Sequence, residues 1–265
     1  MDNAISATWY DLPEKGRDDY ISWLHEVHIP KILKRNGYLW ATHIKNVWNE
    51  DREKEKKRIL VHTDDTGVPE GNDYLILFGA EMPITFFSPS SSQLEETQSL
   101  EEKEMLGRRI GERSCIFMVQ DRIEGLESFS RSPGITPGPA IQIGTFNVNS
   151  LKNEEELSSW YAQVRMPRLK KMEGCVGARL LVSVSGWPKH GIMYEWKSVE
   201  SLLDNFTTET IERSRNAVKS LIHSQVLLHS VKEFGLSPNK ISSKFIDFFQ
   251  RFPCGKSINI LWSLV

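Results

Sequence analysis

The histidine at position 28 is the residue of this chain best placed for acid–base chemistry. It falls with Ile21, Leu24 and Ile32 at spacings of three and four residues, the pattern of an apolar stripe on an amphipathic helix. An apolar setting disfavours the imidazolium form, so the ring should be neutral near pH 7 and able to accept a proton. We therefore predict that His28 is a general acid or base. The alternative is a core histidine hydrogen-bonded to a backbone carbonyl.

Arg165 occupies the place that matches His28 in a second, similar segment of the chain. Arginine stays protonated at neutral pH, so it cannot serve as a base, but it can hold a carboxylate or an enolate. We predict a substrate-binding role for Arg165, and an asymmetric pair of sites. Tyr161 could reach the same cavity and is also a candidate for substrate binding, although the favoured interpretation is a tyrosine on the helix surface.

Aromatic and polar residues on the strand candidates add further candidates for substrate contacts. Alternation places Tyr38 and Trp40 on one face of a strand and His43 on the other face. Tyr194 belongs to a strand of the second half, and Trp23 belongs to the amphipathic helix described above. Aromatic residues on sheets more often belong to the core than to a substrate platform, and this alternative applies to each of them.

Metal binding is not expected from the pattern of potential ligands. His25 and His28 are three residues apart, near one side of the helix, but no further ligands can be assigned, and hydrogen-bonded or solvated histidines are favoured. The three cysteines, Cys115, Cys175 and Cys254, are widely spaced and make neither a disulfide framework nor a zinc pattern. They suit a reducing compartment.

Two segments, Asp18–Gly37 and Glu155–Gly174, are similar to each other. Adding 137 to a position in the first copy gives its partner in the second. Five of the fifteen positions from Trp23 to Gly37 are identical, where background usage would give roughly one. The identical pairs are Trp23/Trp160, Val27/Val164, Pro30/Pro167, Lys34/Lys171 and Gly37/Gly174. We interpret this match as an internal duplication.

Each copy predicts an interrupted helix. A proline inside a helix removes one backbone hydrogen bond and clashes with the preceding turn, so the first helix should kink or restart at His28 to Pro30. Pro167 should do the same in the second copy. Gly37 suits the left-handed position that ends a helix.

Strand-length apolar stretches surround both helices and give the order β-α-β-β-α-β twice, which is the ferredoxin-like unit. The predicted strands are Ala7–Leu12, Tyr38–Val47, Tyr74–Ala80 and Cys115–Asp121 in the first half, and Ile141–Val148, Cys175–Val184, Gly191–Trp196 and Gln225–Phe234 in the second. The second helix of each half is predicted at Ser92–Ile110 and at Ser198–Ile222. The fold class is therefore α+β, with two ferredoxin-like repeats.

The pattern Trp-x4-His-Ile-Pro-x3-Lys-x2-Gly, from Trp23 to Gly37, resembles the dimeric α+β barrel superfamily, and the EthD-like and related small-molecule families within it. Members of that superfamily usually pair two ferredoxin-like chains through their sheets. The resemblance implies that a tandem copy forms this barrel within one chain. It carries over only His28 as a functional position, and Arg165 departs from the pattern.

The resemblance also implies an activity. The expected function is that of a cofactor-independent lyase, isomerase, cyclase or oxygenase on a hydrophobic, aromatic or polyketide-like biosynthetic intermediate. A non-catalytic small-molecule-binding or scaffold protein with a decayed site is the first alternative. A haem-binding relative is the second alternative. We expect no bound organic cofactor.

Composition limits the partners. Of the 265 residues, 33 are Lys or Arg and 35 are Asp or Glu, so a net charge of −2 gives no reason to expect nucleic acid or a membrane as a partner. No charged leader with an apolar segment and no run of 18 apolar residues is present, which predicts a cytoplasmic protein. We expect a small hydrophobic molecule as ligand, and a monomer or a homodimer of pseudo-dimeric chains.

The expected boundaries are a first repeat at 1–130, a linker at 131–140, a second repeat at 141–235, and a C-terminal extension at 236–265. The extension is apolar enough to pack on the barrel or at an oligomer interface. The segment Pro83–Glu104 is an insertion relative to the second copy and is either a lid or a long connection. The charge run Asn49–Arg58 is predicted to be a solvated loop or strand extension.

Overall fold

The computed structural model describes residues 2–46, 66–130, 137–148, 150–206, 222–232 and 257–259. Several sequence predictions lie wholly or largely outside these residues: the charge run at 49–58, most of the linker at 131–140, the distal part of the helix at 198–222, and most of the C-terminal extension at 236–265. None of the helices in the described ranges combines the length and the apolar character that a membrane crossing requires.

The order β-α-β-β-α-β occurs twice, as the apolar patterns predict. The first repeat contains β1 (Ala4–Asp11), α1 (Arg17–Trp23), α2 (Ile29–Leu33), β2 (Tyr38–Asn46), β3 (Tyr74–Ala80), α4 (Ser91–Glu96), α5 (Leu100–Leu106) and β4 (Ile110–Glu124). The second contains β5 (Ala140–Val148), α6 (Leu151–Trp160), α7 (Met166–Leu169), β6 (Cys175–Gly186), β7 (His190–Trp196), α8 (Val199–Phe206) and β8 (Ile222–Lys232).

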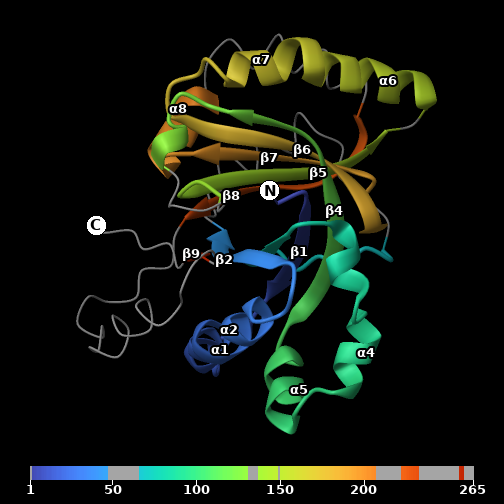
Figure 1. Ribbon diagram of the computed structural model, residues 1–265, viewed down its shortest axis with the longest axis vertical. Helices are drawn as coiled ribbons and strands as arrows, with labels where there is room; N and C mark the ends of the chain where they lie inside the picture. Colours follow the sequence, from blue (N-terminus) through green and yellow to red (C-terminus); the bar gives the residue numbers. More distant parts are fainter. Residues whose placement is uncertain are drawn as a thin grey trace.

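Strands β1 to β8 form a closed ring, which we call the barrel. The order β3-β1-β4-β6-β7-β5-β8-β2 is completed by a pairing of β2 with β3, and every pair in the ring is antiparallel. The repeats meet where β4 pairs with β6 and where β8 pairs with β2. A short strand, β9 (Ser257–Asn259), adds to β2 in parallel. Figure 1 shows α1 and α2 on one side of the barrel and α6 and α7 on the opposite side.

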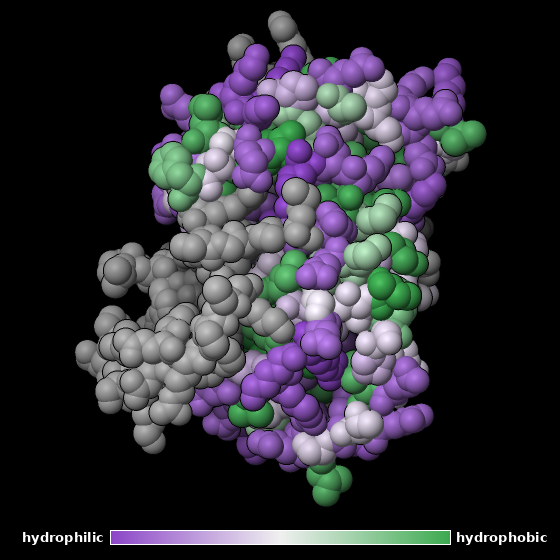
Figure 2. Space-filling model, viewed as in Figure 1, coloured by the Kyte–Doolittle hydropathy of each residue, from purple (hydrophilic) through white to green (hydrophobic). Residues whose placement is uncertain are grey.

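Apolar residues fill three regions: the inside of the barrel and the space between each half of the sheet and its own helices. Trp9, Trp40 and Phe117 are fully buried inside the barrel. Gly79 makes room for Trp40, because a Cβ at this position would lie 2.0 Å from the indole. The barrel interior is therefore a packed core. On the face shown in Figure 2, hydrophilic residues predominate, and hydrophobic residues gather most densely on the right-hand side at mid-height.

A bulge in β2 corrects the predicted faces of this strand. Tyr38 pairs with Ala80 but Trp40 pairs with Gly79, so one extra residue lies in β2 between them. As a result Tyr38 packs with the helices, on the same side as His43, while Trp40 turns into the barrel. Simple alternation groups Tyr38 with Trp40. This grouping is wrong because a bulge reverses the faces of all later residues in the strand. The same irregularity recurs in β6, 137 residues later.

The first helix of the first repeat is interrupted by one π-helical turn, Leu24–His28. The amide of Ile29 donates to the carbonyl of Leu24, five residues earlier, and Pro30 is at the beginning of α2. A wider turn accommodates a proline, because the carbonyl that the ring would meet in a regular helix is displaced. The interruption predicted from Pro30 is thus confirmed, and its form is a π-turn.

The second repeat has the same interruption at Tyr161–Arg165, where Met166 donates to Tyr161 and Pro167 follows. Both π-turns stand at matching positions of the duplication. Since π-turns inside helices are uncommon and are frequently found at functional sites, they draw attention to the side chains they carry.

The insertion at 83–104 folds into helices beside the first repeat. It contains a 3-10 turn (Pro83–Phe87) and the helices α4 and α5. The sequence predicts one helix over 92–110, but Ser99 caps a new helix by accepting from the amide of Glu102, so the chain divides here. Strand β4 already begins at Ile110.

Candidate functional site

Polar side chains gather between the sheet of the first repeat and the helix that contains the π-turn. Tyr10 comes from β1, His43 from β2 and His25 from the π-turn, and all three are at most 5% exposed. They lie among apolar and aromatic residues of the helix-covered core. Burying polar groups in such a place is costly unless they bond to one another.

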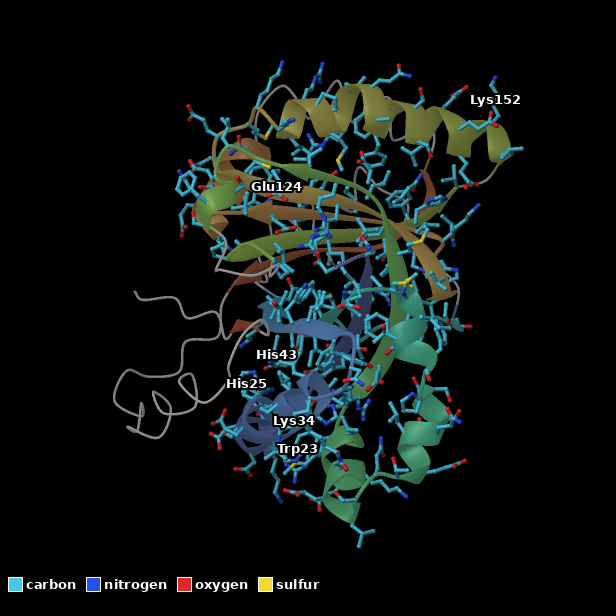
Figure 3. All side chains as sticks on the ribbon, in the orientation of Figure 1. Trp23, His25, Lys34, His43, Glu124 and Lys152 are labelled. Carbon is cyan, nitrogen blue, oxygen red and sulfur yellow. The ribbon has the colours of Figure 1, made fainter. Side chains whose placement is uncertain are left out.

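These three residues form a continuous hydrogen-bonded chain. The hydroxyl of Tyr10 lies 2.8 Å from Nε2 of His43, and Nδ1 of His43 lies 2.9 Å from Nε2 of His25. The ring of Tyr74 stacks near both Tyr10 and His43, with centroids 5.8 Å apart in each case. Figure 3 shows His25 and His43 next to each other between the helix and β2. We call this the Tyr10–His43–His25 chain.

Arg109 holds the tyrosine end of the chain. Its Nε donates to the hydroxyl of Tyr20 at 2.7 Å, and its guanidinium lies 4.6 Å from the centre of the Tyr10 ring. Nη1 of Arg109 lies 3.0 Å from Glu112. A fixed cation therefore stands behind the tyrosines, where it favours any negative charge that develops there.

Burial keeps every member of the chain uncharged at neutral pH. It lowers the pKa of His25 to about 4 and the pKa of His43 well below its ordinary value. For His43, the nearby His25 and the charge of Arg109 lower the pKa further. Burial also raises the pKa of Tyr10 well above its ordinary value, with a further contribution from Tyr20. The chain is thus a neutral path for protons.

Donation along the chain can run in either direction. In one direction, Tyr10 donates to His43, His43 donates to His25, and the proton of His25 is on Nδ1. In the reverse direction, His25 donates to His43, His43 donates to Tyr10, and Nδ1 of His25 is an acceptor. In both cases this Nδ1 atom is the end of the chain, and it is buried without a hydrogen-bond partner among the described residues. Reversing the order moves one proton from one end to the other.

His28, the residue predicted to be catalytic, is half-buried on the same π-turn. Its ring stacks on Trp23 with centroids 5.0 Å apart, and its buried Nδ1 finds no partner within the described ranges. Burial lowers the pKa of His28 to about 4, Arg109 lowers it further, and Glu102 opposes the shift. Glu102, on α5, is held by Lys31 at 2.6 Å. His28 is thus a partly exposed, neutral ring whose pKa responds to both Glu102 and Arg109.

The remaining predicted residues of the first repeat divide into two groups. Trp23 and His43 belong to the helix-covered region with His28. Tyr38 also faces this region, where its ring meets Phe86 edge-on and Arg35 is close to both Tyr38 and His28. Trp40 does not belong to it, because it points into the barrel and donates to Asp2 at 2.8 Å. The bulge in β2 separates Trp40 from the site.

The predicted residues of the second repeat come together in their own helix-covered region. The guanidinium of Arg165 lies 4.9 Å from the centre of the Tyr194 ring, and Tyr161 is in hydrogen-bonding contact with Tyr194. Tyr161 is only 4% exposed, so its interpretation as a helix-surface tyrosine was wrong. The offset of 137 matches Tyr161 to Leu24, which lies on the inward stripe of the first helix.

Among the side chains that the structure describes, the second repeat has no counterpart of the polar chain. The offset of 137 places Ala162 opposite His25 and Leu180 opposite His43. Phe146 packs in its helix-covered core, stacked on Tyr161. The same fold is thus built with apolar residues at these positions.

Sequence reasoning missed Tyr10, Tyr20, Arg109 and Glu102, and noted His25 only for its spacing from His28. The offset offered one usable signal, since two histidines of the first copy align with an alanine and a leucine. No group of three or more His, Cys, Asp or Glu side chains in the described ranges is arranged to hold a metal ion.

Neither a protein-family model nor a curated protein matches this sequence. Among solved structures, the chain is similar to a candidate monooxygenase from Fusobacterium nucleatum subsp. nucleatum, with 11% identity and a TM-score of 0.54 over 86% of this chain and 91% of that chain. It is similar to an anthrone oxidase-like protein, with 10% identity and a TM-score of 0.54 over 87% and 91%. It is also similar to a candidate chlorite dismutase, with 11% identity and a TM-score of 0.51 over 88% and 96%.

At these identities the similarity establishes the fold. This chain is an α+β protein with the tandem ferredoxin-like architecture of the monooxygenase-like and chlorite dismutase-like structures. Fold alone does not assign a reaction, since one architecture supports many chemistries.

Proposed function

We propose that this chain is an enzyme that moves a proton to or from a hydrophobic small molecule bound at the helix-covered side of the first repeat, without an organic cofactor. The observation that carries the proposal is the buried Tyr10–His43–His25 chain, which ends at a π-turn that also presents the neutral ring of His28. The described side chains of the second repeat include no counterpart of this chain.

Packing alone does not explain these polar residues. A buried polar group costs free energy unless it is bonded, and the second repeat reaches the same fold with Ala162 and Leu180 at the matching positions. Retaining two histidines and a tyrosine in one copy therefore calls for a role that the other copy does not have. Proton transfer suits them, because each can both donate and accept.

His28 is the group we assign to contact the substrate. It is more exposed than His25 and His43, and Trp23 holds the plane of its ring. With a pKa of about 4 it is a weak base in the free protein. An anionic intermediate beside the ring would raise that pKa, because an opposite charge favours the imidazolium. Arg109 would stabilise the same anion.

The substrate class follows from the surroundings of His28. His28 stacks on Trp23, which in turn packs on Tyr20, and this aromatic setting favours a flat aromatic or polyketide-like compound with an acidic C–H or phenolic O–H. Lyase, isomerase, cyclase and cofactor-free oxygenase reactions can all begin by removing such a proton. The resemblance to EthD-like families supports this class, and Arg165, Tyr161 and Tyr194 would form an ancillary binding site in the second repeat.

Solvent deuterium exchange tests the proposal without knowledge of the later steps. The purified chain is incubated in D2O with a panel of anthrones, phenols and β-diketones, and the loss of C–H signal is followed by NMR. We expect His28→Ala to lower the exchange rate constant by about 10²- to 10⁴-fold, the usual contribution of a general acid or base. His190→Gln, which changes a buried histidine of the second repeat, is the matched control and should retain exchange.

Three results would contradict the proposal. Full exchange by a folded His28→Ala protein would assign this residue to the core. Binding of panel compounds without exchange would favour the non-catalytic binding or scaffold protein. An intense Soret band that appears when haemin is added, and that is lost in His28→Ala, would favour the haem-binding alternative.

A further inference from the structure

Arg113 lies on the barrel side of β4, away from the helix-covered region. It is 5% exposed, and its guanidinium carbon lies 3.8 Å from the centre of the Trp9 ring. Trp9 is also its register partner on β1. One face of the guanidinium is therefore covered by an indole, and only the edges of the guanidinium remain for hydrogen bonds.

Those edges are only partly used. Nη1 donates to the backbone carbonyl of Trp187 at 3.1 Å, whereas Nε and Nη2 are buried and have no partner among the residues that the structure describes. Nε and Nη2 lie on the same edge of the guanidinium and direct two N–H groups in parallel. This is the fork that binds the two oxygens of a carboxylate.

The groups around Arg113 supply no negative charge. Cys115, two residues along β4, is in contact with Ser183, and burial raises the pKa of its thiol to about 11, so it is neutral. Burial lowers the pKa of Arg113 to about 10, which still leaves it a cation at pH 7. Across the described ranges, no carboxylate forms an ion pair with Arg113.

Two other deeply placed arginines, Arg179 and Arg109, are paired with carboxylates. Arg179 contacts both Asp2 and Glu195, and Arg109 contacts Glu112. A buried cation without a partner is strongly unfavourable, so its retention is explained if a bound anion completes the pair.

We propose that the Nε and Nη2 edge of Arg113 binds the carboxylate of a small organic acid at this end of the barrel. A carboxylate matches the geometry of the fork, and its single negative charge matches the single positive charge present. A phosphate dianion would need a second cation. This site is separate from the helix-covered site, so it stands or falls independently of the proposed function.

Thermal unfolding at constant ionic strength tests the assignment, with benzoate and acetate as the probes and benzamide as the neutral isostere of benzoate. A ligand that binds only the folded state raises Tm in proportion to its saturation. We expect at least one of the two carboxylates, at 20 mM, to raise the Tm of the wild-type chain by about 3 °C or more, in the range for chains of this size. Benzamide should leave Tm unchanged.

Arg113→Lys keeps the charge without the fork, and Arg113→Met removes the charge. Both variants are made, so that the test can still be carried out if only one of them folds. Each should lose the carboxylate response. Arg108→Gln, which changes an arginine paired with Glu104 on the surface, should keep it. The inference is overturned if neither carboxylate raises the wild-type Tm, if benzamide raises it equally, if the Arg113 variants still respond, or if Arg165→Gln abolishes the response instead.

Discussion

His25 and His28 leave the same π-turn, yet their rings are held in different ways. His25 is bonded through His43 to Tyr10, while His28 is stacked on Trp23 and keeps an accessible side. Both are neutral at pH 7 because burial lowers each pKa to about 4. A fixed histidine next to an accessible one is suited to returning a proton after each turnover.

The depressed pKa of His25 predicts acid sensitivity. In the unfolded chain its pKa is about 6.5, and in the folded chain about 4, so stability is present above pH 6.5 and is lost as the pH falls toward 4. Between pH 7 and pH 5 this histidine alone should remove about 2 kcal/mol from the free energy of unfolding.

His25→Ala, which introduces the residue found at the matching place in the second repeat, isolates this effect. Urea unfolding at pH 7 and at pH 5 gives the change in the free energy of unfolding with pH for each protein. The cost of the smaller side chain is the same at both pH values, so it cancels in this difference. The variant should lose about 2 kcal/mol less than the wild type between pH 7 and pH 5. Equal losses in the two proteins would show that His25 does not resist protonation.

At the scale of single residues, the sequence indicated which residues belong to the site better than it indicated their hydrogen-bond partners. His28, Trp23 and His43 were predicted from helical and strand periodicity, and they lie in one helix-covered region. Tyr10 and Arg109 could not be predicted, because their roles depend on contacts between segments that are far apart in sequence. Tyr38 was assigned to the face opposite His43, whereas a bulge places both on the same face.

The π-turn is the element that sets the directions of the histidine side chains. One additional residue per turn shifts the helix face, so that Leu24 and His25 are both buried. Val27, in the same turn, is 46% exposed and can be removed without taking a side chain out of the core.

Deleting Val27 together with Pro30→Ala should convert the segment to a regular helix. The proline must be replaced because it would clash in the regular helix. His25 should then lose its bond to His43, and the deuterium exchange should fall at least tenfold while the helical circular dichroism is retained.

The matched control deletes Val164 and replaces Pro167 by Ala in the second repeat. It should retain most of the exchange activity. Undiminished exchange in the first-repeat variant would show that the π-turn does not position the site.

Elements were predicted from sequence with small errors at their ends. Strand 74–80 has the predicted bounds, and the helix interruption was predicted from Pro30 and Pro167. The π-helical form was missed because it depends on backbone bonding that residue spacing does not encode, whereas the division of 92–110 had a sequence signal in the spacing of Ser99 and Glu102.

At the scale of the whole molecule, one ion cluster joins the chain terminus to both repeats. Asp2 contacts Arg122 at 2.7 Å and also contacts Arg179, which in turn donates to Glu195 at 2.9 Å. The two carboxylates balance the two guanidiniums, so removing one charge leaves a cation buried without compensation.

Glu195→Gln should therefore lower the free energy of unfolding by about 3–5 kcal/mol, as measured by urea denaturation. Glu127→Gln is the matched control, because Glu127 pairs with Lys197 at 3.4 Å on the surface, and it should cost less than about 1 kcal/mol. A cost below 1 kcal/mol for Glu195→Gln would show that the cluster does not hold the repeats together.

The tandem repeat was the strongest sequence signal for the whole molecule, because a constant offset of 137 implies two similar units. The closed order of strands is consistent with it. What the repeat could not indicate is the asymmetry of the two helix-covered regions, since that arises from a few side chains within otherwise equivalent cores.

The central claim is that the first repeat holds neutral histidines poised for proton transfer, and ¹⁵N NMR of the histidine rings between pH 7.5 and pH 3.5 tests it most directly. Single substitutions of His25, His28 and His43 assign the signals. We predict that His28 and His25 remain neutral down to about pH 5 and titrate near pH 4. Titration of His28 near pH 6.5 would show a solvated ring outside any apolar site and would contradict the account.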